Sequence, residues 1–305
     1  MGEDAARITF AIPFHRGLGY LRGAIASVRA QHLAEWRCFV LDDRGEPGGV
    51  AELVASFGDV RIAYHANAAT LGITANWNRC LDLAATEFVT LLHADDELRP
   101  EYAERMLALA DAHPDAVAVC CDAEIIDAAG RARFSLADAV KRRLVPAGEP
   151  WRIAGESGLC ALSRGDFVIC PTLAFRRARL GARRFETSWT QVQDLELLTR
   201  LLLDGESIAG TRRRAYRYRR HAASATALQT GDLSRFEEEV AVLDRLALRA
   251  RERGFAAAAR VAERKTIVRL HLAVRAAGDL ASLRGAAALR TLRFLASIPR
   301  RRGAP

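Results

Sequence analysis

Acidic side chains follow two apolar, strand-like segments, and they are the residues in the sequence best suited to chemistry. Asp42 and Asp43 end the apolar run 36–41, and the segment 93–97 (His-Ala-Asp-Asp-Glu) ends the apolar run 88–92. A carboxylate at a strand end can accept hydrogen bonds from a base or a ribose hydroxyl. Neighbouring oxygen ligands can hold Mg²⁺ or Mn²⁺ against a diphosphate. The alternative is that these acids are ordinary turn and N-cap residues.

The elements around these acids alternate between strand and helix patterns over residues 7–125. Short β-rich runs are separated by stretches in which apolar residues recur at helical spacing, as Leu21, Ile25 and Val28 do. Such alternation predicts right-handed β-α-β units on a mostly parallel sheet. Sheets of this kind bind ligands at the carboxyl ends of their strands, where both acidic segments are expected.

The second half of the chain has a different pattern. Residues 128–170 are irregular and rich in glycine and proline, so we expect a long excursion that contacts substrate. A short strand at 173–175, a helix at about 192–203 and a basic, aromatic strand at 215–219 should follow. After about Leu228 apolar residues recur every three or four positions, which predicts one helix and then two more that are rich in alanine and arginine.

Length and composition limit the class of protein. The chain has 305 residues, of which 50% are apolar, enough for one large or two modest domains with a real core. No apolar run approaches the roughly 18–20 residues of a membrane span, and residues 1–4 do not resemble a signal peptide, so we expect a cytoplasmic protein. The six scattered cysteines are expected to be buried, reduced thiols rather than a zinc site or disulfides.

The net charge of +8 comes entirely from the C-terminal part of the sequence. Residues 1–230 contain 29 basic and 29 acidic side chains, whereas the last 75 contain 16 basic and 8 acidic ones. Arginine-bearing amphipathic helices could contact anionic lipid headgroups. They could instead pack on the main body with a solvated outer face. Nucleic-acid binding is disfavoured, because these helices lack interleaved aromatic residues and a known motif.

Four segments, read in order, resemble the inverting glycosyltransferases of family 2. They are ITFAIPFHRGLGYLRGAIASVRAQ from Ile8, FVLDDRG from Phe39, TLGITANWNRCLDLA from Thr70 and FVTLLHADDEL from Phe88. The resemblance implies the GT-A fold, a Rossmann-like, mostly parallel mixed sheet flanked by helices, here with a C-terminal helical extension. It also implies inverting transfer of a sugar from a nucleotide-diphosphate sugar of the UDP type to an acceptor hydroxyl, with Mn²⁺ or Mg²⁺ as cofactor.

The resemblance also suggests a division of the chain. Residues 1–228 would form the catalytic domain, with a nucleotide-binding half at about 1–127 and an acceptor-side half at about 128–228. Residues 229–305 would form a basic helical extension.

The resemblance assigns a nucleotide site at the strand ends and on the helix after Gly72. Asp43, together with Asp42, would contact a uracil-type base, although Arg44-Gly45 replaces the family's usual pair of small residues. The full set comprises Pro13, Phe14, His15, Arg16, Asp42, Asp43, Asn76, Arg79, Ala94 and Asp95. Asn76 and Arg79 could equally be the polar face of an amphipathic helix.

The same resemblance assigns the metal site. Asp96 would be the principal metal ligand, and Asp95 would contact the ribose or the metal. His221, which precedes Ala222-Ala223-Ser224, could reach the metal or the diphosphate, or could be a lone surface histidine. His93 replaces the first acid of the usual D-x-D-D pattern, either as a supporting group or as a satisfied histidine at a strand end.

Asp194 matches the acid that acts as general base in the family. Inverting displacement needs one carboxylate to take the proton of the attacking hydroxyl. The leaving diphosphate needs no general acid, because cations stabilise its charge. Asp194 could instead be a helix N-terminal acid that complements the dipole. Glu196 should point to another face, and Gln193 stands where the family often has a second acid.

Other functions are weaker alternatives. A sugar-nucleotide pyrophosphorylase would need a glycine-rich loop and a lysine after the first strand, where Pro13 to Arg16 stand instead. The main alternative is a catalytically impaired nucleotide-sugar-binding protein of the same fold. Expected partners are a nucleotide-sugar donor, a glycan or lipid-linked acceptor and an anionic membrane surface, but no nucleic acid. Contact of the C-terminal helices with anionic lipid would place the protein peripherally on the inner face of the membrane. A role in bacterial polysaccharide or cell-envelope glycan synthesis follows only from the resemblance to the family.

Overall fold

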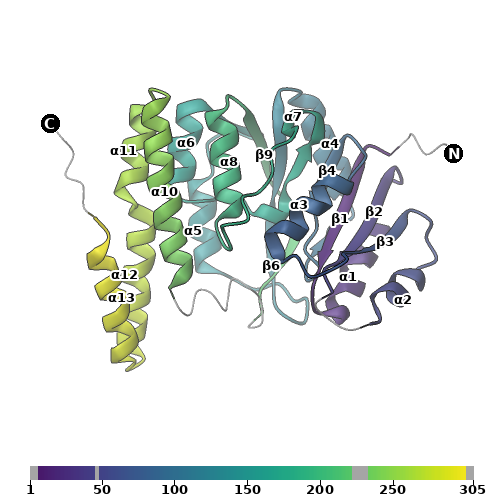
Figure 1. The fold of residues 1–305 in the computed structure, drawn as a ribbon, viewed down its shortest axis with the longest axis horizontal. Helices are drawn as coiled ribbons and strands as arrows, with labels where there is room; N and C mark the ends of the chain where they lie inside the picture. The colour runs from purple at the N-terminus through teal and green to yellow at the C-terminus, as the bar shows by residue number, and fades with distance from the viewer. Residues whose placement is uncertain (1–5, 45–47, 222–232, 300–305) are drawn as a thin grey trace.

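The computed structural model describes residues 6–44, 48–221 and 233–299, which form one mixed β-sheet with helices on both faces (Figure 1). The strand order is β3-β2-β1-β4-β8-β6-β9-β5, and β7 pairs with β9. The strands are β1 (Ile8–Phe14), β2 (Trp36–Asp42), β3 (Ile62–Ala66), β4 (Phe88–Leu91), β5 (Glu97–Leu98), β6 (Ala116–Ile126), β7 (Trp151–Ala154), β8 (Ala174–Arg176) and β9 (Ser207–Arg219).

The N-terminal half of this sheet is parallel, as the sequence predicts. β1 pairs in parallel with both β2 and β4, and β2 pairs in parallel with β3. The short β8 then lies antiparallel between β4 and β6, while β6 and β9 are parallel. The strands β5 and β7 are both antiparallel to β9. The mostly parallel mixed sheet is therefore confirmed, and its parallel half brings the ends of β1, β2 and β4 to one edge.

Helices cover both faces because the central strands are apolar on both sides. One core lies between the sheet and α1, α2 and α4, and the other contains α3, α6 and α8. The helices before β9 are α1 (Leu18–Arg29), α2 (Val50–Ala55), α3 (Ile73–Leu83), α4 (Tyr102–Ala112), α5 (Leu136–Leu144), α6 (Gly155–Arg164), α7 (Arg177–Leu180) and α8 (Gln193–Leu203), and a 3-10 turn covers Cys170–Thr172. All six cysteines are free thiols, and five of them are buried.

The segment 128–170 is more ordered than the sequence predicts. It contains α5, β7 and α6, and its glycines and prolines stand mainly at the boundaries of these elements. β7 pairs with the first part of β9, where a Cβ on Gly210 would lie 2.0 Å from the ring of Trp151. Only glycine allows this close approach. Because β7 has four residues, its periodicity was too short to read from the sequence.

The C-terminal extension is helical, with three helices after the first instead of the predicted two. They are α10 (Ser234–Glu252), α11 (Ala256–Arg264), α12 (Thr266–Ala281) and α13 (Gly285–Ser297). Phe236, Val242 and Leu243 of α10 are buried in the same core as α8. The division at residue 228 remains a prediction, although this shared core ties the first helix of the extension to the body. None of the helices in the described ranges is long and apolar enough to cross a membrane.

Candidate active site

The two aspartates at the end of β2 organise the loop that follows β3. Asp43 is 1% exposed, and its carboxylate accepts hydrogen bonds from Asn67 Nδ2 at 2.9 Å and from the backbone N–H groups of Leu71 and Gly72 at 2.8 and 2.9 Å. Asp42 accepts from the Arg44 N–H and from the Tyr64 hydroxyl. These hydrogen bonds therefore hold β3 and the loop that follows it against the carboxyl end of β2.

The other residues assigned to the nucleotide divide into two groups. Phe14 and Asn76 are buried, and Asn76 Nδ2 donates to the carbonyl oxygen of Leu41. Any contact by Phe14 with a ligand would therefore involve its backbone. Arg16 and Arg79 are exposed, while Pro13, His15 and Ala94 are half-buried. His15 Nδ1 is buried and has no hydrogen-bond partner in the described part of the chain.

The segment after β4 places three possible metal-ligating groups together. Ligand atoms of His93, Asp95 and Asp96 all lie within 4.8 Å of one another. His93 Nδ1 lies 3.8 Å from Asp96 Oδ2, and burial lowers the pKa of His93, which favours the neutral, metal-binding imidazole. His93 Nε2 is buried and lacks a hydrogen-bond partner among the described residues. An imidazole beside carboxylate oxygens is a donor set that suits Mn²⁺ or Mg²⁺.

The two aspartates of this segment occupy different environments. Asp96 is 1% exposed, and its carboxylate accepts from the Tyr216 hydroxyl at 2.9 Å and the Arg219 N–H at 2.7 Å. Burial, followed by the charge of Asp95, raises the pKa of Asp96 well above its usual value. The side chain of Asp95 is 33% exposed, and its Oδ2 lies 3.0 Å from His221 Nε2. Asp95 is thus the more exposed of the two aspartates, and it contacts His221, whose side chain is 14% exposed.

Tyr216 and Arg219 are supporting residues that the sequence did not reveal. Arg219 Nε donates to the carbonyl oxygen of Asp95 at 2.6 Å, and its guanidinium also pairs with Glu97. Only 7% of Arg219 is exposed. The alternating pattern of 215–219 was the available signal, because it places Tyr216 on the buried face of a strand.

Helix α3 connects the donor-side groups to the start of α8. Its N-cap Gly72 binds Asp43, its Thr74 hydroxyl donates to the carbonyl oxygen of Trp189 at 3.0 Å, and the Trp77 ring lies 5.0 Å from the ring of His93. Trp189 stands a few residues before α8. One helix therefore contacts the end of β2, the end of β4 and the segment that leads to Asp194.

Asp194 lies in the first turn of α8, in a poorly solvated position. Its Oδ1 accepts the N–H of Leu195 at 2.8 Å. Burial raises its pKa above the usual value of an aspartate. Asp166 lies near enough for its own pKa to be raised to about 7, first by burial and then by the charge of Asp194. The two carboxyl groups therefore form an interacting pair.

The sequence model of Glycosyl transferase family 2 matches residues 9–180, more than half of the chain. The chain belongs to this family. The match includes every candidate donor-site residue except His221, and it ends before Asp194. A search of curated protein sequences found no match.

Solved structures of other proteins share the fold of this chain. TarS of S. aureus, residues 1–349 in complex with UDP-GlcNAc, aligns with a TM-score of 0.62 and 15% identity, over 80% of this chain and 66% of TarS. The mannosyltransferase PcManGT from Pyrobaculum calidifontis, in complex with GDP-Man and Mn²⁺, aligns with a TM-score of 0.56 and 15% identity, over 95% of this chain and 80% of that one. This chain thus spans just under two thirds of the TarS fragment.

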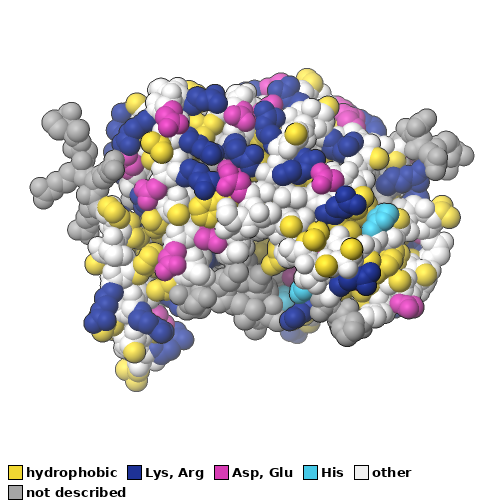
Figure 2. All heavy atoms as spheres, in the orientation of Figure 1, with side chains coloured by type: hydrophobic (Ala, Val, Ile, Leu, Met, Phe, Trp, Pro, Cys, Tyr) yellow, Lys and Arg dark blue, Asp and Glu magenta, His cyan; other side chains and the backbone are white. Residues whose placement is uncertain are grey.

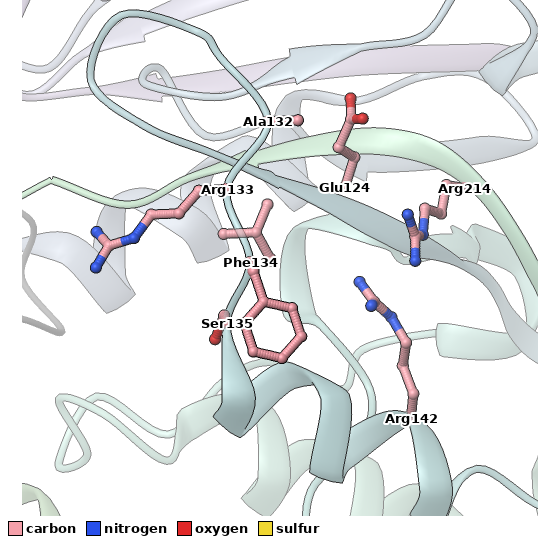
Figure 3. Close-up of a pocket in the computed structure, with 8 residues that line it drawn as sticks. Glu124, Ala132, Arg133, Phe134, Ser135, Arg142 and Arg214 are labelled. Carbon is pink, nitrogen blue, oxygen red and sulfur yellow. The ribbon is translucent and has the colours of Figure 1, made fainter.

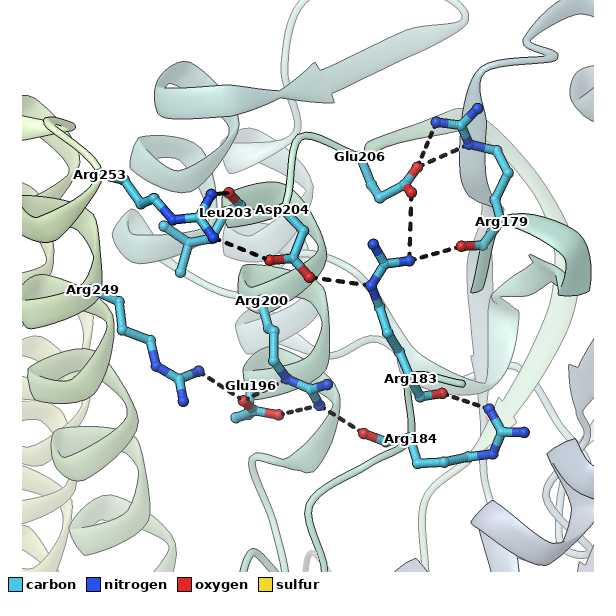
Figure 4. A network of polar contacts seen from close by, with 10 residues as sticks. All are labelled: Arg179, Arg183, Arg184, Glu196, Arg200, Leu203, Asp204, Glu206, Arg249 and Arg253. Carbon is cyan, nitrogen blue, oxygen red and sulfur yellow. Dashed lines mark hydrogen bonds and ion pairs between the residues drawn. The ribbon is translucent and has the colours of Figure 1, made fainter. Parts of the chain in front are cut away.

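Within this family fold, Glu196 is a structural acid. It is 2% exposed, and its carboxylate accepts from Arg200 Nε at 3.0 Å and Nη2 at 2.9 Å. Arg249 of α10 approaches it at 3.6 Å, so the group ties α8 to the C-terminal helices (Figure 4). The same view shows Asp204 between Arg183 and Arg253 at the other end of α8. Unlike Glu196, Asp194 of α8 forms no ion pair with an arginine among the described residues.

The Asp166–Asp194 pair predicts a pH-dependent effect on stability. Because folding raises the pKa of Asp166 from about 3.9 to about 7, the wild type should lose stability as pH rises through that window. Asparagine does not titrate. The free energy of unfolding of Asp166→Asn, relative to that of the wild type, should therefore increase by about 2 kcal/mol or more when the pH is raised from 5 to 8. Urea unfolding at both pH values measures this, with the exposed Asp82→Asn as control. If the stability difference between Asp166→Asn and the wild type is the same at pH 5 and pH 8, then Asp166 is ionised at both pH values and its pKa is not raised.

Proposed function

We propose that this protein transfers a sugar from a nucleotide-diphosphate sugar to an acceptor hydroxyl with inversion at the anomeric carbon. The observation that carries the proposal is the cluster of His93, Asp95 and Asp96 at the end of β4, whose ligand atoms lie within 4.8 Å of one another. Family membership supports the transferase class, and the strand-end position is where such sheets bind nucleotides. We propose that the donor is a UDP sugar.

We assign the metal to Asp95 and His221, with His93 as a third candidate. This differs from the sequence expectation, which made Asp96 the principal ligand. The side chain of Asp95 is 33% exposed and its Oδ2 lies 3.0 Å from His221 Nε2, whereas both oxygens of the buried Asp96 already accept hydrogen bonds. A bound Mn²⁺ or Mg²⁺ would stabilise the negative charge of the leaving diphosphate. Asp96 holds the strand end in place through Tyr216 and Arg219.

Asp194 is the proposed general base. Its raised pKa and its position at the start of α8 suit a carboxylate that accepts the proton of the attacking hydroxyl. The contacts of Glu196 with two arginines exclude it from this role.

The acceptor side is proposed to lie over β6, α5 and the segment between them. A hollow of about 210 Å³ opens there, lined by Glu124, Arg142 and Arg214 and by Phe134, which is 78% exposed (Figure 3). Arg142 and Arg214 approach from different elements and share Asp122. An exposed aromatic ring beside arginines can pack on a sugar ring and bind its polar groups. We propose a glycan or lipid-linked acceptor of bacterial polysaccharide or envelope synthesis, which would bring the enzyme to a membrane surface.

Ligand-dependent stabilisation tests the function most directly. The full chain is heated with UDP, GDP, UDP-GlcNAc or GDP-Man, with and without Mn²⁺, and release of the free nucleotide is then followed. A transferase should show a metal-dependent rise in Tm with one nucleotide and slow hydrolysis of the matching sugar donor. Stabilisation without any turnover would favour the catalytically impaired binding protein. The absence of stabilisation by every nucleotide would overturn the proposed donor site.

A further inference from the structure

Helix α12 has two apolar faces, and only one of them is buried. Val268 and Leu272 belong to the core that includes α8 and α10, and Ala276 is also buried. On the opposite side, Leu270 is 53% exposed and Val274 is 61% exposed. Ala273, Ala277 and Ala281 extend this exposed line at helical spacing and are also exposed, so the outer face of α12 carries no charge.

Helix α13 also exposes apolar side chains. Leu289 and Leu292 are 49% and 43% exposed, and Ala296 follows on the same face one turn later. The turn that joins the two helices carries Leu283, which is 94% exposed. We call the surface formed by Leu270, Val274, Leu283, Leu289 and Leu292 the hairpin face.

Helix α10 of the same extension exposes mainly charged side chains. The exposed positions of α10 include Glu237, Asp244 and Glu252, with Leu248 as a single exposed leucine among them. A solvated outer face of this kind was the alternative expected for all C-terminal helices. It describes α10 but not the hairpin of α12 and α13.

The hairpin of α12 and α13 carries a net positive charge. Residues 266–299 contain five arginines and a single acid, Asp279. Asp279 is buried and pairs with Arg284 at 2.9 Å. Arg290 and Arg293 are exposed on α13, next to the leucines. Figure 2 shows Lys and Arg side chains gathered at the lower end of the hairpin, with hydrophobic atoms at its tip.

The positive charge distinguishes between two partners that could cover the hairpin face, a second copy of the chain and an anionic membrane. Two copies of the hairpin placed face to face would bring two cationic surfaces together, which opposes self-association. An anionic lipid surface would accept the leucines among its acyl chains and the arginines among its phosphates. We infer that the hairpin of α12 and α13 binds anionic membranes by laying its apolar face into the headgroup region.

The position of the hairpin suits this role. In Figure 1 it extends past the lower edge of the body, and β1 runs from the side of the N-terminus toward that same edge. The carboxyl ends of β1, β2 and β4, where the candidate active site lies, therefore face the side on which the hairpin protrudes. A membrane bound there would lie near the site, within reach of an acceptor that is held on a lipid.

Vesicle flotation with the full chain tests the inference without requiring turnover. Vesicles contain either 30% phosphatidylglycerol in phosphatidylcholine or phosphatidylcholine alone, at 0.15 M NaCl. The wild type should float with the anionic vesicles only. Leu270→Gln/Leu289→Gln should lower the apparent affinity about tenfold or more, because two large apolar side chains no longer insert. Arg290→Gln/Arg293→Gln should lower it by a similar factor and reduce its salt dependence.

The matched control is Val60→Gln/Leu248→Gln, which changes two exposed apolar residues outside the hairpin face. It should bind vesicles as the wild type does, and equal Tm values for all variants would exclude misfolding. Failure of the wild type to bind anionic vesicles, or full binding by the leucine variant, overturns the inference. Sedimentation that shows a wild-type dimer and a monomeric leucine variant overturns it in favour of self-association. Because no donor is present, these results are independent of the transferase assay.

Discussion

Replacement of Asp194 by asparagine is expected to lower kcat for sugar transfer by about 10²–10⁴-fold, with donor affinity nearly unchanged. Asparagine keeps the size of the side chain and can still accept the N–H of Leu195, which Asp194 Oδ1 binds at 2.8 Å. It cannot take a proton from the acceptor hydroxyl. The loss should therefore fall on the chemical step, as single-turnover kinetics with saturating donor would show.

The chain offers a control for this variant on the same helix. Asp204 lies at the other end of α8 and forms partly exposed ion pairs with Arg183 and Arg253. Asp204→Asn should cost at most about 1 kcal/mol in stability and leave turnover intact. Since burial raises the pKa of Asp194, the wild-type kcat should also fall on the acid side at a pH above the usual range of aspartate. Near-normal turnover of Asp194→Asn would disprove the assignment.

The parallel half of the fold could be predicted because its signals are local. Each of β1, β2 and β4 is a short apolar run, and acids follow the ends of β2 and β4 closely in the sequence. A parallel sheet then aligns these ends without any further information. Asp43 and the segment 93–96 were therefore found together at one edge, before their partners were known.

The partners could not be predicted because they depend on distant pairings. Asp96 accepts hydrogen bonds from residues more than a hundred positions away, and that contact requires β5, a strand of two residues, to pair with β9. No periodicity can be read from two residues. The sequence therefore named Asp96 as a ligand from its place in a motif, whereas its burial became visible only in three dimensions.

For the C-terminal helices, the sequence predicted the elements but not which of their faces is buried. Periodicity located them, but α12 repeats apolar residues on two faces, and sequence alone does not say which face is covered. The buried face follows from the shared core with α10 and α8. Only that packing shows that Leu270 and Val274 remain uncovered and thus available for binding.

Separate alanine replacements of Asp95 and Asp96 should have opposite consequences. Asp95→Ala removes an accessible side chain that contacts His221, so stability should change little. It should abolish the rise in Tm caused by Mn²⁺ with the nucleotide and lower turnover by about 10²-fold or more, because the charge of the leaving diphosphate is no longer neutralised. Thermal unfolding with and without Mn²⁺ and nucleotide measures the first effect.

Asp96→Ala should instead weaken the fold. It leaves the buried hydroxyl of Tyr216 and the N–H of Arg219 without their acceptor, at about 1–3 kcal/mol for each group. Urea unfolding without metal should show this loss, and Tyr216→Phe should recover part of the stability in the Asp96→Ala background, since it removes one orphaned donor. If Asp96→Ala folds normally and loses only its response to Mn²⁺, then Asp96 is the metal ligand and Asp95 is not. The same cluster would then hold the metal through its buried carboxylate, as the motif alone implied.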